Sequence, residues 1–175
     1  LEATLPPKTE YTITFDPGAD VVNIEEFDAK INPIRLQNEV LKTTQPFRVF
    51  FVCNLIDECI AQKEPVLVFS QRLNFLNECK NHRDGLLLQG TNSNKAQDLV
   101  QEFQAKDSKC MVFYISTKAG CGITLTRATR VILCDPSWNP SDDLQALHRV
   151  YRFGQSKPVV VYRLICDHSI EVRIK

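Results

Sequence analysis

The chain has 175 residues, of which 43% are hydrophobic, and its 21 lysines and arginines balance 21 aspartates and glutamates. A chain of this size can bury one substantial core without metal or disulfide staples, so we expect a single domain. The longest apolar run, Phe47 to Ile56, carries Arg48 and Asn54 and is too short to cross a bilayer, which excludes a membrane-spanning segment of this chain. We therefore expect a soluble chain with no membrane partner.

Charge and cysteine content add two expectations. Residues 1–109 carry a net charge of −4 and residues 110–175 a net charge of +4, so a partner with phosphates would fit the second half, although ordinary solvated surfaces show the same spread. The seven cysteines form no C-x-x-C pair, and several lie inside apolar runs. This pattern predicts a reducing compartment, with no metal site and no disulfide.

The chain opens with a strand pattern, Glu10 to Phe15, between a Pro-Pro entry and a Pro-Gly turn. An acidic, irregular stretch follows, and we treat residues 1–34 as a lead-in and residues 35–175 as the main domain. Residues 47–62 carry apolar side chains at helical spacing, and the apolar run VLVFS at residues 66–70 predicts a buried strand.

The same alternation continues to the end of the chain. Further apolar runs at strand length are Leu86 to Leu88, Met111 to Ile115, Val131 to Cys134 and Val159 to Ile165. Residues 94–104 and 141–151 fit helices between them. Alternating strands and helices, with runs that are apolar on both faces, predict an α/β fold with a parallel sheet covered by helices on both sides. Ligands of such sheets bind at the carboxyl ends of the strands.

The segment STKAGCGITLT (116–126) follows one predicted strand directly. Its glycines let backbone N–H groups approach an anion, and Ser116, Thr117 and Lys118 add side-chain donors to a phosphate. The alternative is a Gly-rich turn that only makes a tight connection. The segment is not a Walker A loop, because G-x-x-x-x-G-K-[ST] occurs nowhere in the chain.

The segment VILCDPSWNP (131–140) ends a predicted strand with Asp135 and then presents Trp138 between turn-forming residues. An Asp in this place can hold magnesium, but without a phosphate loop we expect it to cap the turn that follows. Trp138 could stack on a base or pack along a nucleic-acid backbone. A lone tryptophan is otherwise a core or domain-interface residue.

In QALHRVYRFGQ (145–155), Gln145, His148, Arg149 and Arg152 recur every three or four residues, so a helix ending at Gly154 would present them on one face. Arginines are planar, permanently charged donors that suit a γ-phosphate as charge develops on it. The alternative is a solvated basic face whose arginines pair with Asp142 and Asp143. We expect neither arginine to fill the core. We interpret His148 as a structural or surface histidine.

Taken in order, these segments resemble the Swi/Snf-type helicase-like ATPases of helicase superfamily two. The matching motifs cover almost the whole chain: LPPKTEY (5–11), VLVFSQ (66–71), LLLQG (86–90), STKAGCGITLT (116–126), DPSWNP (135–140), DLQALHRVYRFGQSKPVVVYRL (143–164) and SIEVRI (169–174). The resemblance implies a RecA-like fold, the family's second, C-terminal motor lobe. The sequence RVYRFGQ (149–155) is most similar to the corresponding segment of the ATRX-like and related plant branches.

The resemblance also implies roles for individual residues. Arg149 and Arg152 match the arginines of motif six, which reach the nucleotide, and Gln145 helps to position them. Motif five, which in the family touches both DNA and the ATP cleft, is matched by Ser116, Thr117, Lys118, Gly120 and Gly122. The remaining DNA-contact positions are Ser70, Gln71 and Arg72 at motif four, Gln89 and Gly90 beside it, and Trp138 and Asn139 in the tryptophan-containing element.

The function implied is an ATP-dependent translocase on double-stranded DNA that remodels nucleosomes or other DNA-bound proteins in the nucleus. ATP and Mg²⁺ would bind mainly to a first RecA-like lobe outside this chain, and the isolated lobe would be inactive. Motif five departs from the family, because it has one residue fewer and carries Thr124 where the family has Asn. Two alternatives therefore stay open: a degenerate lobe that binds DNA or protein without turnover, and a freestanding nucleotide-binding enzyme, against which the missing phosphate loop argues.

Overall fold

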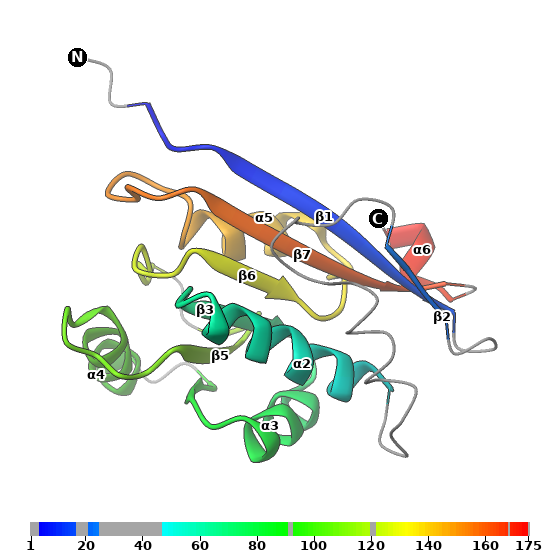
Figure 1. Ribbon diagram of the computed structural model, residues 1–175, viewed down its shortest axis with the longest axis horizontal. Helices are drawn as coiled ribbons and strands as arrows, with labels where there is room; N and C mark the ends of the chain where they lie inside the picture. The colour runs from blue at the N-terminus through cyan, green and yellow to red at the C-terminus, as the bar shows by residue number, and fades with distance from the viewer. Residues whose placement is uncertain are drawn as a thin grey trace.

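The computed structural model describes residues 4–16, 21–24, 47–90, 93–119, 122–167 and 169–174. Within these residues the chain forms one seven-stranded sheet with helices packed against both faces (Figure 1). The strands are β1 (Lys8–Asp16), β2 (Val21–Ile24), β3 (Val66–Ser70), β4 (Leu86–Leu88), β5 (Val112–Ser116), β6 (Arg130–Leu133) and β7 (Val159–Cys166). The helices are α2 (Phe47–Ala61), α3 (Leu73–His82), α4 (Ser93–Gln104), α5 (Pro140–His148) and α6 (Glu171–Ile174).

The strand order is β2-β1-β7-β6-β3-β5-β4. Every pair in the sheet is parallel except β1 with β2, which is antiparallel. All residues of β3 and β6 are buried, because these central strands are covered on both faces. This arrangement confirms the predicted α/β fold with a parallel sheet, and it places the carboxyl ends of six strands along one edge.

Two hydrophobic clusters hold the helices to the sheet. Helices α2 and α3 cover one face, where Phe51, Leu55 and Leu76 are fully buried. Helices α4 and α5 cover the other face, where Phe103 of α4 and Leu147 of α5 are buried. Figure 1 shows α2 and α3 in front of the sheet and α5 behind it. The segment that carries the predicted phosphate donors, between β5 and β6, contains no helix in its described part and packs against the second cluster.

The predicted lead-in strand is β1. It pairs in parallel with β7 from Lys8↔Val159 to Phe15↔Cys166, so this part of residues 1–34 lies within the sheet. Just before the strand, the carbonyl of Pro7 accepts a hydrogen bond from the Val159 N–H at 3.0 Å. The boundary between residues 34 and 35 lies outside the described residues, and the division of the chain there stays a prediction.

The helix predicted over residues 141–151 is α5, which begins at Pro140 and ends at His148, three residues before the predicted end. Its last turn tightens, because the Arg149 and Val150 N–H groups donate to carbonyls three residues back. The Arg149 carbonyl leaves the helical pattern altogether and accepts from the Leu125 N–H at 2.9 Å. Arg152 and Gly154 therefore lie in a turn segment beyond the helix, and Gly154 has a φ of 100°. The prediction that one helix, ending at Gly154, presents Gln145, His148, Arg149 and Arg152 on a single face was wrong.

None of the described helices has the length and apolar content needed to cross a membrane. The six described cysteines are free thiols, and four of them, Cys53, Cys59, Cys79 and Cys134, are buried. Burial raises the pKa of the Cys134 thiol well above its ordinary value, so this group stays a neutral core side chain.

Candidate functional site

A cavity of about 200 Å³ lies where α5 ends against the segment that follows β5. It is lined by Gly122, Ile123, Gln145, His148, Arg149 and Arg152. Four of these residues belong to the predicted nucleotide set, although about twenty residues separate the two segments along the chain. The prediction that they act at one place thus has a geometric basis, even though no single helix face presents them. Gly120 of the same set lies outside the described residues.

Backbone and side-chain hydrogen bonds join the two segments. The Arg149 guanidinium donates to the Ala119 carbonyl at 2.8 Å, and the Arg152 guanidinium donates to the Thr124 hydroxyl at 3.0 Å. Together with the bond between the Leu125 N–H and the Arg149 carbonyl, these contacts position both arginines from the segment after β5. Gly122 has a φ of 85°, a conformation that side chains with a Cβ rarely adopt, so glycine suits this turn.

The two arginines differ in exposure. Arg149 is 7% exposed, whereas Arg152 and Gln145 are exposed to solvent. We expected that neither arginine would fill the core, and for Arg149 this expectation was wrong, because its side chain is buried. The alternative pairing with Asp143 has no support either, since that carboxylate is buried and accepts from Arg163 at 2.9 Å.

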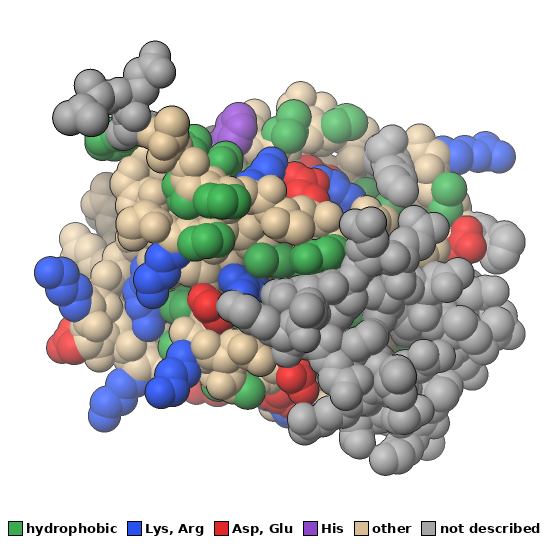
Figure 2. All heavy atoms as spheres, turned by 45° about the horizontal axis from the view of Figure 1, so that its top comes forward, with side chains coloured by type: hydrophobic (Ala, Val, Ile, Leu, Met, Phe, Trp, Pro, Cys, Tyr) green, Lys and Arg blue, Asp and Glu red, His purple; other side chains and the backbone are tan. Residues whose placement is uncertain are grey.

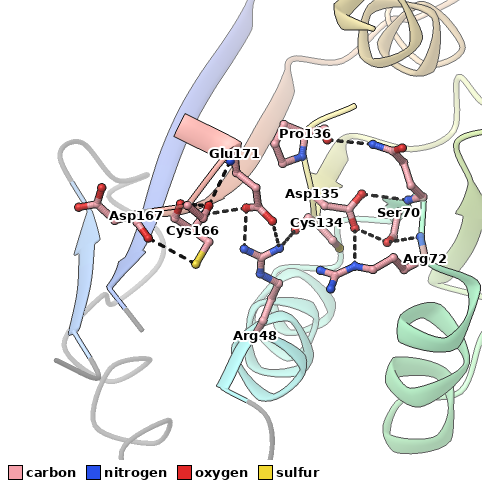
Figure 3. A network of polar contacts seen from close by, with 11 residues as sticks. Arg48, Ser70, Arg72, Cys134, Asp135, Pro136, Cys166, Asp167 and Glu171 are labelled. Atoms are coloured by element: carbon pink, nitrogen blue, oxygen red, sulfur yellow. Dashed lines mark hydrogen bonds and ion pairs between the residues drawn. The ribbon is translucent and has the colours of Figure 1, made fainter. Parts of the chain in front are cut away.

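The predicted DNA-contact residues lie mostly at the carboxyl ends of the strands. Ser70 ends β3, and it is fully buried, with its hydroxyl hydrogen-bonded to Asp135 in the segment just after β6 (Figure 3). The Gln71 N–H donates to the other Asp135 oxygen at 2.9 Å, and the Arg72 guanidinium lies 3.7 Å from the same carboxylate. Asp135 therefore caps the turn after β3, and the expectation that it caps the turn after its own strand was wrong.

This network decides which motif-four side chains face solvent. The Ser70 hydroxyl is enclosed and the Gln71 amide donates to the Pro136 carbonyl at 2.8 Å, so both hold the turn in place. Arg72 keeps an exposed side chain. It lines an open cavity of about 820 Å³ between the starts of α2 and α3 and helix α6. Arg72 is consequently the motif-four side chain that can reach a partner directly.

The remaining predicted DNA residues also follow strand ends. Lys118, after β5, is exposed, while the Thr117 hydroxyl is buried without a hydrogen-bond partner among the described residues. After β4, Gln89 and Gly90 are both exposed, and Gly90 has a φ of 77°.

The tryptophan-containing element follows β6. Trp138 is 69% exposed, which excludes the core alternative for this side chain. The Asn139 side chain accepts from the Ser141 N–H at 3.1 Å and so caps the start of α5. On the face shown in Figure 2, basic, acidic and apolar side chains are interspersed, with several basic ones gathered at the lower left. Among the described residues, this face therefore presents no uniformly basic surface.

A family model described as the helicase conserved C-terminal domain matches residues 48–154, which include every described residue of the small cavity. The chain belongs to this family. Its resemblance to the Swi/Snf-type ATPases is confirmed as well, and it is a Swi/Snf-type helicase C-terminal lobe with a RecA-like fold.

Two curated relatives and one solved structure show the extent of this similarity. Protein CHROMATIN REMODELING 24 of Arabidopsis thaliana is 35% identical over 164 residues, covering 89% of this chain and 14% of the relative. The SNF2 domain-containing protein ENL1 of Oryza sativa subsp. japonica is 35% identical over 137 residues, covering 73% and 14%. The crystal structure of the C-terminal part of the Fun30 ATPase domain matches with a TM-score of 0.65 and 36% identity, covering 74% of this chain and 44% of that chain.

The lobe thus spans about one seventh of the length of these curated relatives. The narrower assignment to an ATRX-like or related plant branch stays a prediction.

The donor set of the small cavity fits the phosphate end of a nucleotide. Two guanidinium groups line it, and none of its lining residues carries a carboxylate. Its volume is too small for a whole nucleoside triphosphate, so these residues suit a terminal phosphate. ATP bound there would supply the phosphoryl group, and Arg149 and Arg152 would hold its charge.

Sequence reasoning missed two features of the lobe. Arg48 donates to both oxygens of Glu171 at 3.0 and 2.8 Å and to the Cys134 carbonyl at 3.2 Å, joining α2, α6 and the end of β6 (Figure 3). Nothing in the spacing of residues 48 and 171 signals this pair. Sequence reasoning also missed the contact between Thr124 and Arg152. The signal that could have pointed to it is that Thr124 stands where the family has Asn.

Proposed function

We propose that the lobe is the second motor lobe of an ATP-dependent translocase on double-stranded DNA, acting within a longer nuclear protein. Its first RecA-like lobe would bind most of ATP and Mg²⁺, and this lobe would close over the terminal phosphate. The observation that carries the proposal is the cavity where Arg149, Arg152 and Gln145 meet Gly122. A relative named for chromatin remodelling and a similar ATPase domain support nucleosomes or other DNA-bound proteins as the substrate.

In this function the two arginines divide the work according to their exposure. Arg149 is buried and fixed to the Ala119 carbonyl, so it contributes a stationary positive charge at the wall of the cavity. Arg152 is exposed and can donate from its planar fork to a phosphate oxygen as negative charge develops during transfer. Gln145 is exposed and lines the same cavity, and it would help to place them.

The DNA would be held along the edge formed by the carboxyl ends of the strands. Arg72, Lys118 and Trp138 offer exposed side chains there, two for phosphates and one for stacking or backbone packing. Gln89, Gly90, Ser116 and Asn139 complete the proposed contact set. Ser70, Gln71 and Thr117 would act by holding the turns that carry these residues, because their polar side-chain groups are engaged or enclosed.

Replacing Arg152 with Ala in the two-lobe protein tests the proposal. ATP turnover at saturating DNA is expected to fall by roughly 10³ to 10⁵, the scale found for arginine fingers in phosphoryl transfer. The affinity for DNA, measured by fluorescence anisotropy, is expected to stay within about twofold of the wild type. Arg152 lies in the small cavity and not among the proposed DNA contacts at the carboxyl ends of the strands. Lysine at this position should rescue little, since a point charge lacks the forked donor geometry.

A second candidate function is a lobe that binds DNA or protein without turnover, favoured by the shortened motif five. It predicts that the intact protein hydrolyses no ATP and that Arg152→Ala changes nothing that can be measured. Near wild-type turnover in the Arg152→Ala variant of an active protein would refute the arginine-finger role.

A further inference from the structure

Arg152 depends on one side chain for its position. It lies beyond the end of α5, its guanidinium is exposed, and among the described residues its side-chain hydrogen-bond partner is the Thr124 hydroxyl at 3.0 Å. Arg149 differs, because it is buried and its guanidinium donates to a backbone carbonyl, which no substitution of a neighbouring side chain removes. The two cavity arginines are therefore anchored in different ways.

We propose that Thr124 is a positioning residue that holds Arg152 in a conformation ready for the terminal phosphate. This inference rests on the proposed function. A free arginine side chain samples many rotamers, and fixing one costs up to about 2 kcal/mol of entropy. A hydrogen bond from one guanidinium N–H to Thr124 leaves the other N–H groups of Arg152 available for phosphate oxygens.

Threonine suits this task for two reasons. Its branched Cβ restricts rotation about χ1, so its hydroxyl oxygen presents a fixed acceptor. The hydroxyl accepts from Arg152 while the methyl group occupies the other branch, which makes valine a close match in shape without the acceptor. The family's asparagine also offers an acceptor oxygen at this position.

The test compares Thr124→Val with Thr124→Ser in the two-lobe protein. Loss of the acceptor in Thr124→Val is expected to lower kcat for ATP at saturating DNA about tenfold, which corresponds to about 1.4 kcal/mol. KM for ATP is expected to change by less than about twofold, because Arg152 acts mainly on charge that develops during transfer. Thr124→Ser keeps the hydroxyl and is expected to stay within about twofold of the wild-type kcat.

Thr126→Val is the matched control. Thr126 lies in the same segment and is partly buried like Thr124, but its hydroxyl accepts from Gln104 instead of an arginine of the cavity. The same change of atoms there is expected to leave kcat unaltered. Thermal melting of all variants identifies any loss of folded protein. The ratio of kcat in Thr124→Val to kcat in Thr124→Ser then separates an effect on positioning from an effect on folding.

A double-mutant cycle with Arg152→Ala separates this inference from the proposed function. If Thr124 acts through Arg152, Thr124→Val adds no further loss of kcat to Arg152→Ala. A steep loss in Arg152→Ala with wild-type kcat in Thr124→Val would overturn the positioning role and leave the arginine finger intact. An equal loss from Thr124→Val in both backgrounds would also overturn it. Wild-type kcat in Arg152→Ala would overturn the proposed function itself.

Discussion

Arg149 and Arg152 share a motif and a cavity, yet their surroundings assign them different physical tasks. Arg149 is buried and donates to the Ala119 carbonyl, so it belongs partly to the core of the lobe. Arg152 contacts the Thr124 hydroxyl from an exposed position. Sequence alone predicted both as exposed donors, because charge is a poor guide to burial when an arginine finds a carbonyl partner inside the fold.

The difference predicts stability effects of different size for the two alanine variants. Arg149→Ala is expected to destabilise this chain by about 1 to 3 kcal/mol, since it leaves a cavity and an unpaired Ala119 carbonyl. Arg152→Ala is expected to change the free energy of unfolding by less than about 0.5 kcal/mol, as exposed substitutions do. Urea denaturation followed by circular dichroism measures both. Equal losses would mean that exposure does not separate the two roles.

At the scale of elements, six of the strands were predictable, whereas β2 (Val21–Ile24) and the connections were not, since β2 lies in the stretch that we expected to be irregular. Runs such as VLVFS are apolar on both faces, a pattern that is typical of a covered parallel strand, and β3, β5, β6 and β7 confirm this interpretation. The end of α5 was missed because the Arg149 carbonyl bonds to Leu125, a residue more than twenty positions earlier. Asp135 was assigned to the wrong turn for the same reason, since its partners come from the neighbouring strand.

Helix α6 is tied to α2 by the Arg48–Glu171 pair, and this contact predicts a pH dependence. Burial opposes ionisation of Glu171, but hydrogen bonds from Arg48 and from the Cys166 N–H outweigh it, so the pKa of Glu171 lies below its ordinary value. A lowered folded-state pKa stabilises the protein above the unfolded pKa, and this stability is lost as pH falls through the folded value. The loss is expected below about pH 4.5.

Glu171→Gln tests this contribution. The variant is expected to be less stable at pH 7 by about 1 to 2 kcal/mol, because the charge-assisted bonds to Arg48 weaken. It should also lose less stability than the wild type between about pH 5 and pH 3, since the titrating group is gone. Glu102→Gln, an exposed carboxylate on α4, is the control and should follow the wild-type curve. Parallel acid curves for Glu171→Gln and the wild type would contradict the assignment.

At the scale of the whole molecule, the sheet order and the family motifs explain why prediction succeeded for the fold but only in part for the site. The motif segments were recognised one by one, and the carboxyl edge of a parallel sheet was expected to gather ligand-binding residues. Long-range contacts decided the remainder: the buried Ser70 hydroxyl is hydrogen-bonded to Asp135, Trp138 is exposed, and Arg152 donates to Thr124 on a different segment. Such contacts follow from packing in three dimensions, which no local pattern contains.

The chain by itself is expected to show no magnesium-dependent ATP turnover. Two guanidinium groups line its small cavity, but the sequence contains no G-x-x-x-x-G-K-[ST] loop to hold the phosphates of a nucleotide through backbone N–H groups. Arginines alone cannot orient an attacking water and a phosphoryl group in line, so the rate gain that they supply requires a nucleotide held by a partner lobe. A coupled-enzyme assay on residues 1–175, with and without duplex DNA, measures this directly, and the Arg152→Ala chain serves as the control for contaminating ATPases. Turnover that exceeds this control would mean that the chain forms a complete site, and the assignment of a second motor lobe would then be wrong.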